Sequence, residues 1–362
     1  MRVLLLRANP RKTGYTQRLA DWFLQGLREA GAEVSDVDLP ALTITPCRGC
    51  YSCWHTTPGR CTHHDGMTPL LEEVLMADVL VCVTPFYYFT MSSCLKMFFE
   101  RLLPLASPGV NTSGRGFARN TTRYPERWKG KRLVTLIAGA LRDTAPYRPA
   151  NETFQMIADS LELEVGGQLI RPESYLLDYP LSRPRTLRLI QAAFVQAGRE
   201  AGRDGRLTQE TMTAAARPLA VDFHHFRAYS NLYWEHACQM GRQALVPGEV
   251  QKRVSVDVRI LMREMVRCVD AKATARTRAV LQFEFPDQGL CFEVDLDRGR
   301  CVLSQRRAER PDLCVRCDSA TWSGLFMRQL DFYEALKHHR IVLEGDKSLF
   351  ARLDRFFPPP SD

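Results

Sequence analysis

Short apolar runs alternate with amphipathic helical patterns through the first half of this 362-residue chain. In the predicted strand from Val79 to Thr84, the five residues before the threonine are all apolar, so both faces of the strand are apolar. Such strands are typical of parallel sheets, because crossover helices cover both faces of those sheets. The pattern predicts an α/β domain built on a doubly wound, five-stranded parallel sheet. The strands are expected at 2–6, 33–39, 79–84, 133–138 and 165–170.

A different pattern begins near residue 250. After a helical stretch, short strands are separated by turn signals such as Pro286–Gly289 and Asp297–Gly299, and helices follow them. Strands followed by helices, rather than alternating with them, indicate an α+β domain. Its strands are expected at 279–285, 290–296, 300–305, 313–317 and 341–344.

These two patterns divide the chain into three regions. Residues 1–205 are expected to form the α/β domain, 206–249 a helical extension or linker, and 250–362 the α+β domain. Within the first region, residues 104–130 show no clear periodicity. A lid, a dimer arm and a solvated insertion all remain open for that segment.

The composition restricts the class of protein. Hydrophobic residues make up 45% of the chain and charged residues 25%, which is typical of globular proteins. The net charge of +8 is spread along the sequence without a long basic run, so nucleic acid is not an expected partner. Anionic small molecules, such as phosphorylated cofactors, suit this charge balance.

The cysteine content bears on the compartment. The apolar stretch at the start is too short for a signal peptide, and no stretch reaches membrane-spanning length, so we expect a cytoplasmic protein without stable membrane insertion. In a reducing cytosol, clustered cysteines favour metal or redox roles over a disulfide framework. Of the twelve cysteines, four lie close together in the spacing C-x2-C-x2-C-x7-C: Cys47, Cys50, Cys53 and Cys61.

Four clustered thiols permit several outcomes. They match the ligand number of an iron–sulfur cluster and of a zinc ion. Free thiols and a disulfide remain open as alternatives. Three nearby histidines could replace a ligand, although solvated side chains are the more ordinary role for them: His55, His63 and His64.

A second candidate site follows the first predicted strand. The loop that precedes the first helix contains Asn9-Pro-Arg-Lys-Thr-Gly14, followed by Thr16. A helix N-terminus offers free backbone N–H groups and the positive end of a dipole, both of which suit a phosphate. A capped helix with solvated basic residues is the simpler alternative.

This loop resembles the phosphate loop of the flavodoxin-like NAD(P)H-dependent FMN reductases. The turn from Thr84 to Met91 resembles the turn that borders the isoalloxazine ring in that family, and Gly139 occupies a third matching position. The chain departs from the family pattern at Tyr15, where asparagine is common, and at Phe89-Thr90, where Gly-Asn is usual. The resemblance implies FMN bound by Asn9, Arg11, Lys12, Gly14, Thr16, Pro85, Phe86, Tyr87, Tyr88, Phe89 and Gly139.

The cysteine segment resembles that of the iron–sulfur flavoproteins in the same superfamily. In those proteins a compact cysteine motif holds a [4Fe–4S] cluster beside FMN. The resemblance implies that Cys47, Cys50, Cys53 and Cys61 hold such a cluster, which would accept single electrons from the flavin.

The region from about 250 to 357 resembles the sterol-carrier-protein domain. The resemblance rests on the order of the strands from Val280 and Cys291, the helix at Trp322 and the tail from Ile341 to Asp346. It implies an apolar tunnel for a lipid-like ligand. A domain that only supports dimerisation, or that packs against the flavin domain, is the alternative.

Together the resemblances imply an FMN-dependent NAD(P)H oxidoreductase with ping-pong kinetics and a small oxidised acceptor or a cluster as electron sink. No general acid or nucleophile can be named, and Tyr87 and Tyr88 are candidates by position only. A homodimer is the expected assembly. A non-enzymatic electron-transfer or redox and lipid-sensing flavoprotein remains an alternative, as does a fusion in which the flavin site has decayed.

Overall fold

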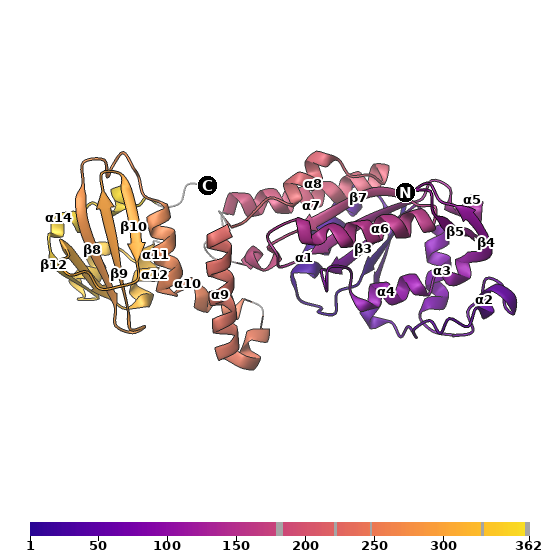
Figure 1. The fold of residues 1–362 in the computed structure, drawn as a ribbon, viewed down its shortest axis with the longest axis horizontal. Helices are drawn as coiled ribbons and strands as arrows, with labels where there is room; N and C mark the ends of the chain where they lie inside the picture. Colours follow the sequence, from indigo (N-terminus) through magenta and orange to yellow (C-terminus); the bar gives the residue numbers. More distant parts are fainter. Residues whose placement is uncertain (179–183, 221–222, 247, 327–328, 359–362) are drawn as a thin grey trace. The chain divides into compact units, whose positions relative to one another are not determined.

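The structure is a computed structural model of the chain. It describes residues 1–178, 184–220, 223–246, 248–326 and 329–358. The contacts divide the described chain into two compact units, which Figure 1 draws as ribbons. The first unit comprises residues 1–177 and 184–220, and the second comprises residue 178 and residues 223–358.

The first unit contains the expected five-stranded parallel sheet, in the order β2-β1-β3-β6-β7. All four neighbouring pairs run parallel, which confirms the doubly wound α/β prediction. Because β1 lies between β2 and β3, the chain reverses its direction of winding between β1 and β3. The strands are β1 (Arg2–Arg7), β2 (Glu33–Asp38), β3 (Val79–Pro85), β6 (Arg132–Ala138) and β7 (Glu164–Arg171).

Helices bury both faces of this sheet (Figure 1). Leu4 and Leu80 share one core cluster with residues of α3, α4 and α6. Alternate strand residues, such as Leu5 and Val81, point to the opposite face, where α1 and α7 pack together. The helices of this unit are α1 (Tyr15–Glu29), α2 (Ser52–His55), α3 (Met67–Met76), α4 (Ser93–Glu100), α5 (Pro125–Trp128), α6 (Arg148–Ser160), α7 (Pro184–Asp204) and α8 (Gln209–Ala215).

The segment without clear periodicity folds into a hairpin. Strands β4 (Ala106–Thr112) and β5 (Ala118–Thr122) pair antiparallel, with a shift in register between Ser107 and Val110. Most side chains of β4 are exposed, so the segment lacks the apolar alternation that usually reveals a strand. The buried Trp128 in α5 then joins the main core of the unit.

Helices α1 and α7 approach closely because glycines lie at their crossing. A Cβ atom at Gly26 would overlap the carbonyl oxygen of Val195, and one at Gly198 would overlap the carbonyl oxygen of Phe23. Both obstacles are backbone atoms, so a side-chain rotation cannot remove them. The long helix from Pro184 is thereby held on the α1 face of the sheet.

The substitution Gly198→Ala should lower the free energy of unfolding of this unit by about 1–3 kcal/mol, because overpacking a fixed crossing forces the backbones apart. Hydrogen exchange of the α1 and α7 amides in the full chain would report this unit alone. Gln191→Ala, at an exposed position of the same helix, serves as the matched control and should change little. Equal protection in both variants would contradict the close crossing.

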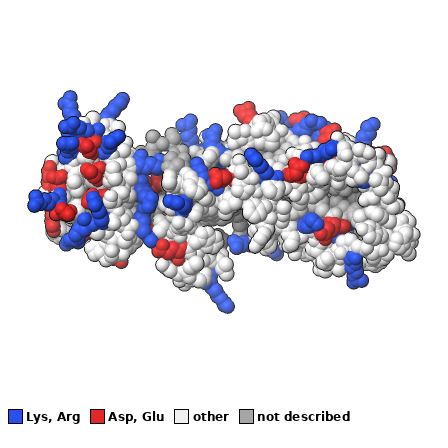
Figure 2. Space-filling view, viewed as in Figure 1, with Lys and Arg blue, Asp and Glu red and all other residues white. Residues whose placement is uncertain are grey.

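The second unit contains a five-stranded mixed sheet in the order β10-β9-β8-β11-β12, which confirms the α+β prediction. Its pairs are antiparallel except for β8 and β11, which run parallel. One face is buried, and Figure 2 shows basic and acidic side chains mixed over this unit. The strands are β8 (Arg278–Phe285), β9 (Leu290–Asp297), β10 (Arg300–Ser304), β11 (Leu313–Cys317) and β12 (Ile341–Gly345).

The helical region that precedes this sheet differs from expectation. In place of one helix there are two, because the Asp257 side chain caps a new helix by accepting a hydrogen bond from the Arg259 backbone N–H. The helices of this unit are α9 (Phe223–Met240), α10 (Glu249–Ser255), α11 (Val258–Arg267), α12 (Ser319–Phe326), α13 (Phe332–Lys337), α14 (Lys347–Phe350) and α15 (Leu353–Phe356).

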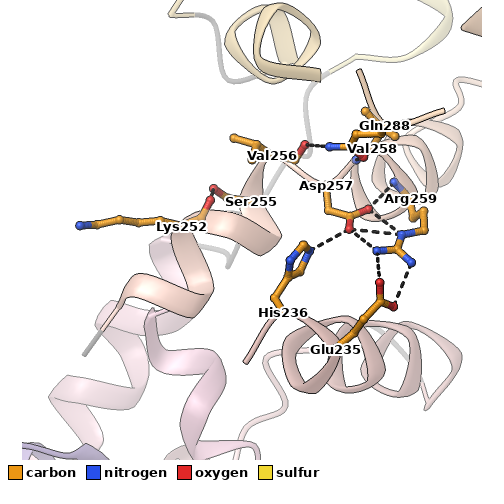
Figure 3. Close-up of polar contacts among 9 residues, drawn as sticks. All are labelled: Glu235, His236, Lys252, Ser255, Val256, Asp257, Val258, Arg259 and Gln288. Carbon is orange, nitrogen blue, oxygen red and sulfur yellow. Dashed lines mark hydrogen bonds and ion pairs between the residues drawn. The ribbon is translucent and has the colours of Figure 1, made fainter. Parts of the chain in front are cut away.

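Polar contacts fasten α9 to the start of α11 (Figure 3). The buried Asp257 carboxylate lies 2.9 Å from His236 Nε2 and 2.6 Å from a guanidinium nitrogen of Arg259. Arg259 also forms an ion pair with the more exposed Glu235. The segment 206–249 is divided between the two compact units. Helix α8 lies in the first unit and α9 lies in the second.

Burial opposes ionisation of Asp257, but the hydrogen bonds from His236 and Arg259 outweigh burial and lower its pKa to about 2. A depressed carboxyl pKa stabilises the fold above the unfolded value, and that stabilisation is lost as the pH falls through the folded value. Asp257→Asn should therefore cost about 1–3 kcal/mol at neutral pH, because two partly buried donors lose their charged acceptor.

The stability gap between the wild-type chain and Asp257→Asn should shrink as the pH falls from about 4 toward 2. Unfolding measured across this pH window tests it. Glu235→Gln alters the exposed partner of the same arginine and should cost less than about 1 kcal/mol at any pH. A gap that does not change with pH would contradict the role assigned to Asp257.

Candidate functional site

Three loops meet at the carboxyl edge of the parallel sheet in the first unit. They follow β1, β3 and β6, and backbone hydrogen bonds join them. The Ala8 N–H donates to the Val83 carbonyl at 2.8 Å, and the Phe86 N–H donates to the Ala138 carbonyl at 2.8 Å. In open α/β sheets, ligands bind at this edge, where the direction of winding reverses.

Ser92 ties the first two loops together, and the sequence pattern did not single it out. Its hydroxyl donates to the Ala8 carbonyl at 2.7 Å, and its N–H donates to the Thr84 hydroxyl at 3.0 Å. The Cys94 thiol also contacts the Ala8 carbonyl. A serine at the start of a helix indicates an N-cap, but only the folded sheet shows that it bridges two loops.

The predicted phosphate loop leads directly into α1. Gly14 is the residue before the helix and has extended backbone angles, and Arg11 and Lys12 are exposed on the loop. Thr16 lies in the first turn, which contains no acidic residue. The N-terminus of this fifteen-residue helix thus presents its free N–H groups beside two cationic side chains.

The Asn9 side chain forms hydrogen bonds inside this loop. Its side chain is buried, and the Nδ2 atom donates to the Arg11 carbonyl at 2.7 Å and to Gln17 Oε1 at 3.2 Å. The Oδ1 atom is buried and has no hydrogen-bond partner among the described residues. An acceptor in this position suits a hydroxyl of a bound ligand rather than a phosphate, which accepts hydrogen bonds.

The turn after β3 holds aromatic residues in a strained backbone. Tyr88 and Phe89 have φ angles of 43° and 66°, in the left-handed region, and Tyr87 pairs with Thr90 across the turn. Bulky residues rarely adopt this region, and strain of this kind collects at functional sites. The Tyr88 side chain is 97% exposed, and Tyr87 and Phe89 are about half exposed. Pro85 ends β3, and its side chain is buried.

Phe86 has a different environment from the other residues of the turn. Its ring packs on the buried Tyr147, with ring centroids 4.2 Å apart. Tyr147 in turn lies against Gly139, where a Cβ atom would overlap its hydroxyl group. Burial raises the pKa of Tyr147, and its hydroxyl donates to the Leu141 carbonyl. Gly139 is thus required for close packing of the loop after β6.

An ion pair further along the loop after β6 connects this loop to the residues that follow β7. The Arg142 guanidinium lies 2.8 Å from the buried Glu173 carboxylate. Glu173 also accepts hydrogen bonds from the N–H groups of Leu219 and Ala220. The three loops that carry the predicted flavin residues are therefore brought to one edge and supported there by buried contacts.

The second predicted set also converges. A small pocket is lined by all four clustered cysteines together with residues that follow α4, among them Arg101 and Pro104. Cys53 is buried, Cys50 is exposed, and the other two are intermediate. Of the three histidines near the motif, only His63 lies among the residues described as lining this pocket. All twelve cysteines of the chain lie within the described ranges and carry free thiols.

The environment of the thiols favours charged sulfur at some positions. The Gly49 and His63 N–H groups each lie 3.5 Å from a cysteine sulfur, those of Cys47 and Cys61 respectively. Hydrogen bonds from Ser52 and Thr62 lower the pKa of the exposed Cys50 thiol. Burial, and then repulsion from the neighbouring Cys61, raise the pKa of Cys53. The four thiols thus lie in different environments around one pocket.

A buried ion pair closes the cysteine segment, and the sequence did not reveal it. Arg101 and Asp65 form two hydrogen bonds of 2.8 and 3.0 Å, and the Arg101 guanidinium also donates to the Thr45 carbonyl. Hydrogen bonds from Arg101 outweigh burial and hold the Asp65 pKa well below its usual range. Because Thr45 and Asp65 lie at the two ends of the segment, Arg101 fixes where the cysteine loop begins and ends.

Helix α4 connects the two candidate sites. Its N-terminal Cys94 contacts the Ala8 carbonyl at the flavin edge, whereas Glu100 and Arg101 at its other end line the cysteine pocket. Eight helical residues span about 12 Å at a rise of 1.5 Å per residue. The two sites therefore lie at opposite ends of one rigid element.

Two kinds of feature are absent from the described part of the chain, a site for a single metal ion and a membrane-spanning helix. Within the described ranges, no three His, Cys, Asp or Glu side chains are arranged to hold a single metal ion. No helix within those ranges is long and apolar enough to cross a membrane.

Comparisons with known proteins match both units. Residues 1–144 match the NADPH-dependent FMN reductase family, and residues 262–358 match the SCP-2 sterol transfer family. An iron-sulfur flavoprotein of Archaeoglobus fulgidus is 31% identical over 104 residues, which cover 29% of this chain and 46% of that protein. An iron-sulfur flavoprotein of Methanocaldococcus jannaschii is 30% identical over 105 residues, covering 29% and 53%. The chain therefore spans about half the length of these relatives.

Among solved structures, an FMN-dependent NADH-azoreductase of Bacillus anthracis in complex with FMN aligns with a TM-score of 0.43 and 14% identity. This alignment covers 56% of the chain and 99% of the azoreductase. The two family matches fall on the two sheets described above, one in each compact unit. The chain thus joins an N-terminal domain like the NADPH-dependent FMN reductases and iron-sulfur flavoproteins to a C-terminal domain like those of the SCP-2 sterol transfer family.

Proposed function

We propose that this protein is an FMN-dependent NAD(P)H oxidoreductase that passes electrons to a small oxidised acceptor or to a cysteine-bound iron–sulfur cluster. The observation that carries the proposal is the meeting of three loops at the reversal point of the parallel sheet, with the N-terminus of α1 among them. When bound, FMN supplies hydride acceptance and one-electron transfer, which no side chain provides.

Different residues around this edge bind the phosphate, the ribityl chain and the ring system of FMN. Arg11, Lys12 and the backbone N–H groups that follow Gly14 bind the phosphate, with the Thr16 hydroxyl as a further donor. The unpaired Asn9 Oδ1 accepts a hydrogen bond from a hydroxyl of the ribityl chain. Phe86 to Phe89 and Gly139 border the ring system, where a flat ligand can lie against aromatic side chains. No residue is assigned as a general acid or base.

Cys47, Cys50, Cys53 and Cys61 hold the cluster in this proposal. A tetrahedral zinc site draws all four sulfurs to about 2.3 Å from one point. A four-iron cluster also takes four cysteines, but it spreads them over its metal ions. All four thiols line one pocket, which supports a ligand that they share. N–H groups directed at Cys47 and Cys61 stabilise thiolate ligands.

The remaining parts of the proposal concern the C-terminal domain, the assembly and the partners. The C-terminal domain binds a lipid-like ligand, and the working assembly is a cytoplasmic homodimer that uses NAD(P)H and a small oxidised acceptor. Nucleic acid is not a partner in this proposal. In function, residues 1–205 form the flavin domain, 206–249 an extension and 250–362 the carrier domain.

A non-enzymatic redox and lipid sensor is the second candidate, favoured by the exposure of the Cys50 thiol and by the hydrogen bonds from Ser52 and Thr62 that lower its pKa. Steady-state oxidation of NAD(P)H by the purified FMN-loaded protein separates the two. Turnover with a quinone or another added acceptor supports the oxidoreductase. Bound FMN that is not reduced by either NADH or NADPH would leave the sensor as the better account.

The double substitution Arg11→Ala and Lys12→Ala should weaken FMN binding by about ten- to a hundredfold, because charge-assisted contacts to a phosphate contribute about 1.5–3 kcal/mol. Riboflavin, which lacks the phosphate, should bind the wild-type chain and this variant with similar affinity. Fluorescence titration measures both affinities. Arg28→Ala at the opposite end of α1 is the control. If this control weakened FMN binding as much, the loop would not be the phosphate site.

The cluster is tested by metal and sulfide analysis of anaerobically purified protein. Cys53→Ser and Cys61→Ser should each lose iron and sulfide while retaining FMN, since the two sites lie at opposite ends of α4. The exposed Cys238→Ser is the matched control and should keep both cofactors. Wild-type protein that binds zinc, or neither metal, after reconstitution with iron and sulfide would refute the cluster and leave the flavin proposal standing.

A further inference from the structure

A chain of hydrogen bonds leads from β1 and β2 through α1 to the predicted phosphate loop. It begins at Arg7, the last residue of β1, whose side chain is only 8% exposed. The Arg7 guanidinium forms hydrogen bonds of 2.7 and 2.9 Å with Asp36 of β2 and one of 2.6 Å with Asp21 of α1. Burial alone would lower the pKa of Arg7, but its hydrogen bonds to the two carboxylates outweigh burial and raise it. Arg7 thus remains a cation that joins β1, β2 and α1.

The hydrogen bonds continue from Asp21 to the loop. Gln17 lies about one helical turn before Asp21, and its Nε2 atom donates at 3.2 Å to the same carboxylate oxygen that Arg7 contacts. Gln17 Oε1 accepts a hydrogen bond of 3.2 Å from Asn9 Nδ2, which also donates to the Arg11 carbonyl at 2.7 Å. Arg7, Asp21, Gln17 and Asn9 are called the Arg7 relay below. The relay connects a buried cation with the backbone of the phosphate loop.

The carboxylate of Asp21 fixes the direction of the hydrogen bonds that follow it. A carboxylate only accepts hydrogen bonds, so Gln17 must turn its nitrogen toward Asp21 and its oxygen toward Asn9. Asn9 must then turn its nitrogen toward Gln17 and the Arg11 carbonyl. Reversal of either amide would bring one acceptor against another. The relay therefore permits one orientation of the Asn9 side chain.

The last hydrogen bond of the relay acts on the loop itself. Among the described residues, the Asn9 side chain has two hydrogen-bond partners, Gln17 Oε1 and the Arg11 carbonyl. Gln17 thus holds Asn9, and Asn9 holds the backbone between the exposed Arg11 and Lys12 side chains. Removing the Gln17 amide should free the loop although Gln17 itself lies in α1.

We propose that the Arg7 relay positions the phosphate loop for FMN, with Arg7, Asp21 and Gln17 as positioning residues that act through Asn9. The inference rests on the phosphate site proposed above and adds to it residues that lie outside the loop. A binding loop that is already ordered loses less conformational entropy when its ligand binds. The intact relay should therefore raise the affinity of the loop for FMN.

The relay is tested first on the flavin-free full chain. Trypsin cleaves after Arg11, and the carbonyl of that peptide bond is the one that Asn9 holds. Gln17→Leu has a side chain of similar size that can neither donate to Asp21 nor accept from Asn9. Mass spectrometry of the released N-terminal fragment should show cleavage about three- to tenfold faster than in the wild-type chain, because the loop opens more often.

Gln25→Leu is the matched control in the same helix. Gln25 donates to Glu29 at 2.8 Å, four residues later, just as Gln17 donates to Asp21. The control therefore removes an equivalent pair without touching the loop. Its cleavage rate should stay within about twofold of the wild-type rate. Equal cleavage of Gln17→Leu and Gln25→Leu would overturn the proposal.

Arg7→Gln interrupts the relay at its buried end and should accelerate the same cleavage. Its control is Arg2→Gln, because Arg2 lies at the other end of β1 and forms an exposed ion pair with Glu33 of β2. Far-ultraviolet circular dichroism establishes that each variant is folded. An unchanged cleavage rate in folded Arg7→Gln would remove Arg7 from the relay. Gln17 is only partly buried, so Gln17→Leu remains decisive if Arg7→Gln does not fold.

A second readout compares two flavins. Lumiflavin has the ring system of FMN but neither its ribityl chain nor its phosphate. Gln17→Leu should weaken FMN binding by about three- to tenfold and change lumiflavin binding by less than about twofold, because the relay acts on the loop and not on the aromatic turn. Fluorescence titration measures both affinities. Equal losses for FMN and lumiflavin would contradict a role confined to the phosphate loop.

The relay and the proposed flavin site can fail separately. A wild-type chain that does not bind FMN would overturn the flavin site, whatever the cleavage rates are. A wild-type chain that binds FMN, together with equal cleavage of Gln17→Leu and Gln25→Leu, would overturn the relay alone.

Discussion

Parallel pairing of β1 with β2 on one side and β3 on the other is the constraint on which the candidate site depends. It places the loops after β1 and β3 side by side at the carboxyl edge, and the hydrogen bond from Ala8 to Val83 continues the strand pairing into the first loop. In open α/β sheets, ligands bind at such a reversal point. The α1 N-terminus, the strained turn at Tyr88 and the Gly139 loop come to one edge only through this arrangement.

The cysteine segment depends on a different kind of interaction. Between Thr45 and Asp65 the regular structure that the backbone forms is one short helix, α2, with turns after it. The buried Arg101 and Asp65 pair, together with the Thr45 carbonyl, closes its two ends on the residue that follows α4. A buried ion pair contributes more to a unique geometry than to stability, because desolvation offsets much of the attraction. Such a geometry is what a ligand set of four thiols requires.

The second unit separates its stabilising contacts from its cavity. The outer face of its sheet carries cross-strand ion pairs such as Arg316 with Glu284, and buried polar contacts around Asp257 and Glu264 join α9 to α11. The cavity, in contrast, is lined mostly by apolar side chains.

The sequence by itself determined the two five-stranded sheets and the order of their strands along the chain, because apolar periodicity depends on near neighbours, and its compact motifs predicted the residues of both candidate sites. The strands of the parallel sheet match their predicted ranges to within one residue, whereas the β4–β5 hairpin was missed because its exposed side chains carry no apolar alternation. Only the tertiary structure decided that Ser92 joins two loops and that Arg101 closes the cysteine segment. Both depend on groups distant in sequence that meet once the sheets and helices have packed.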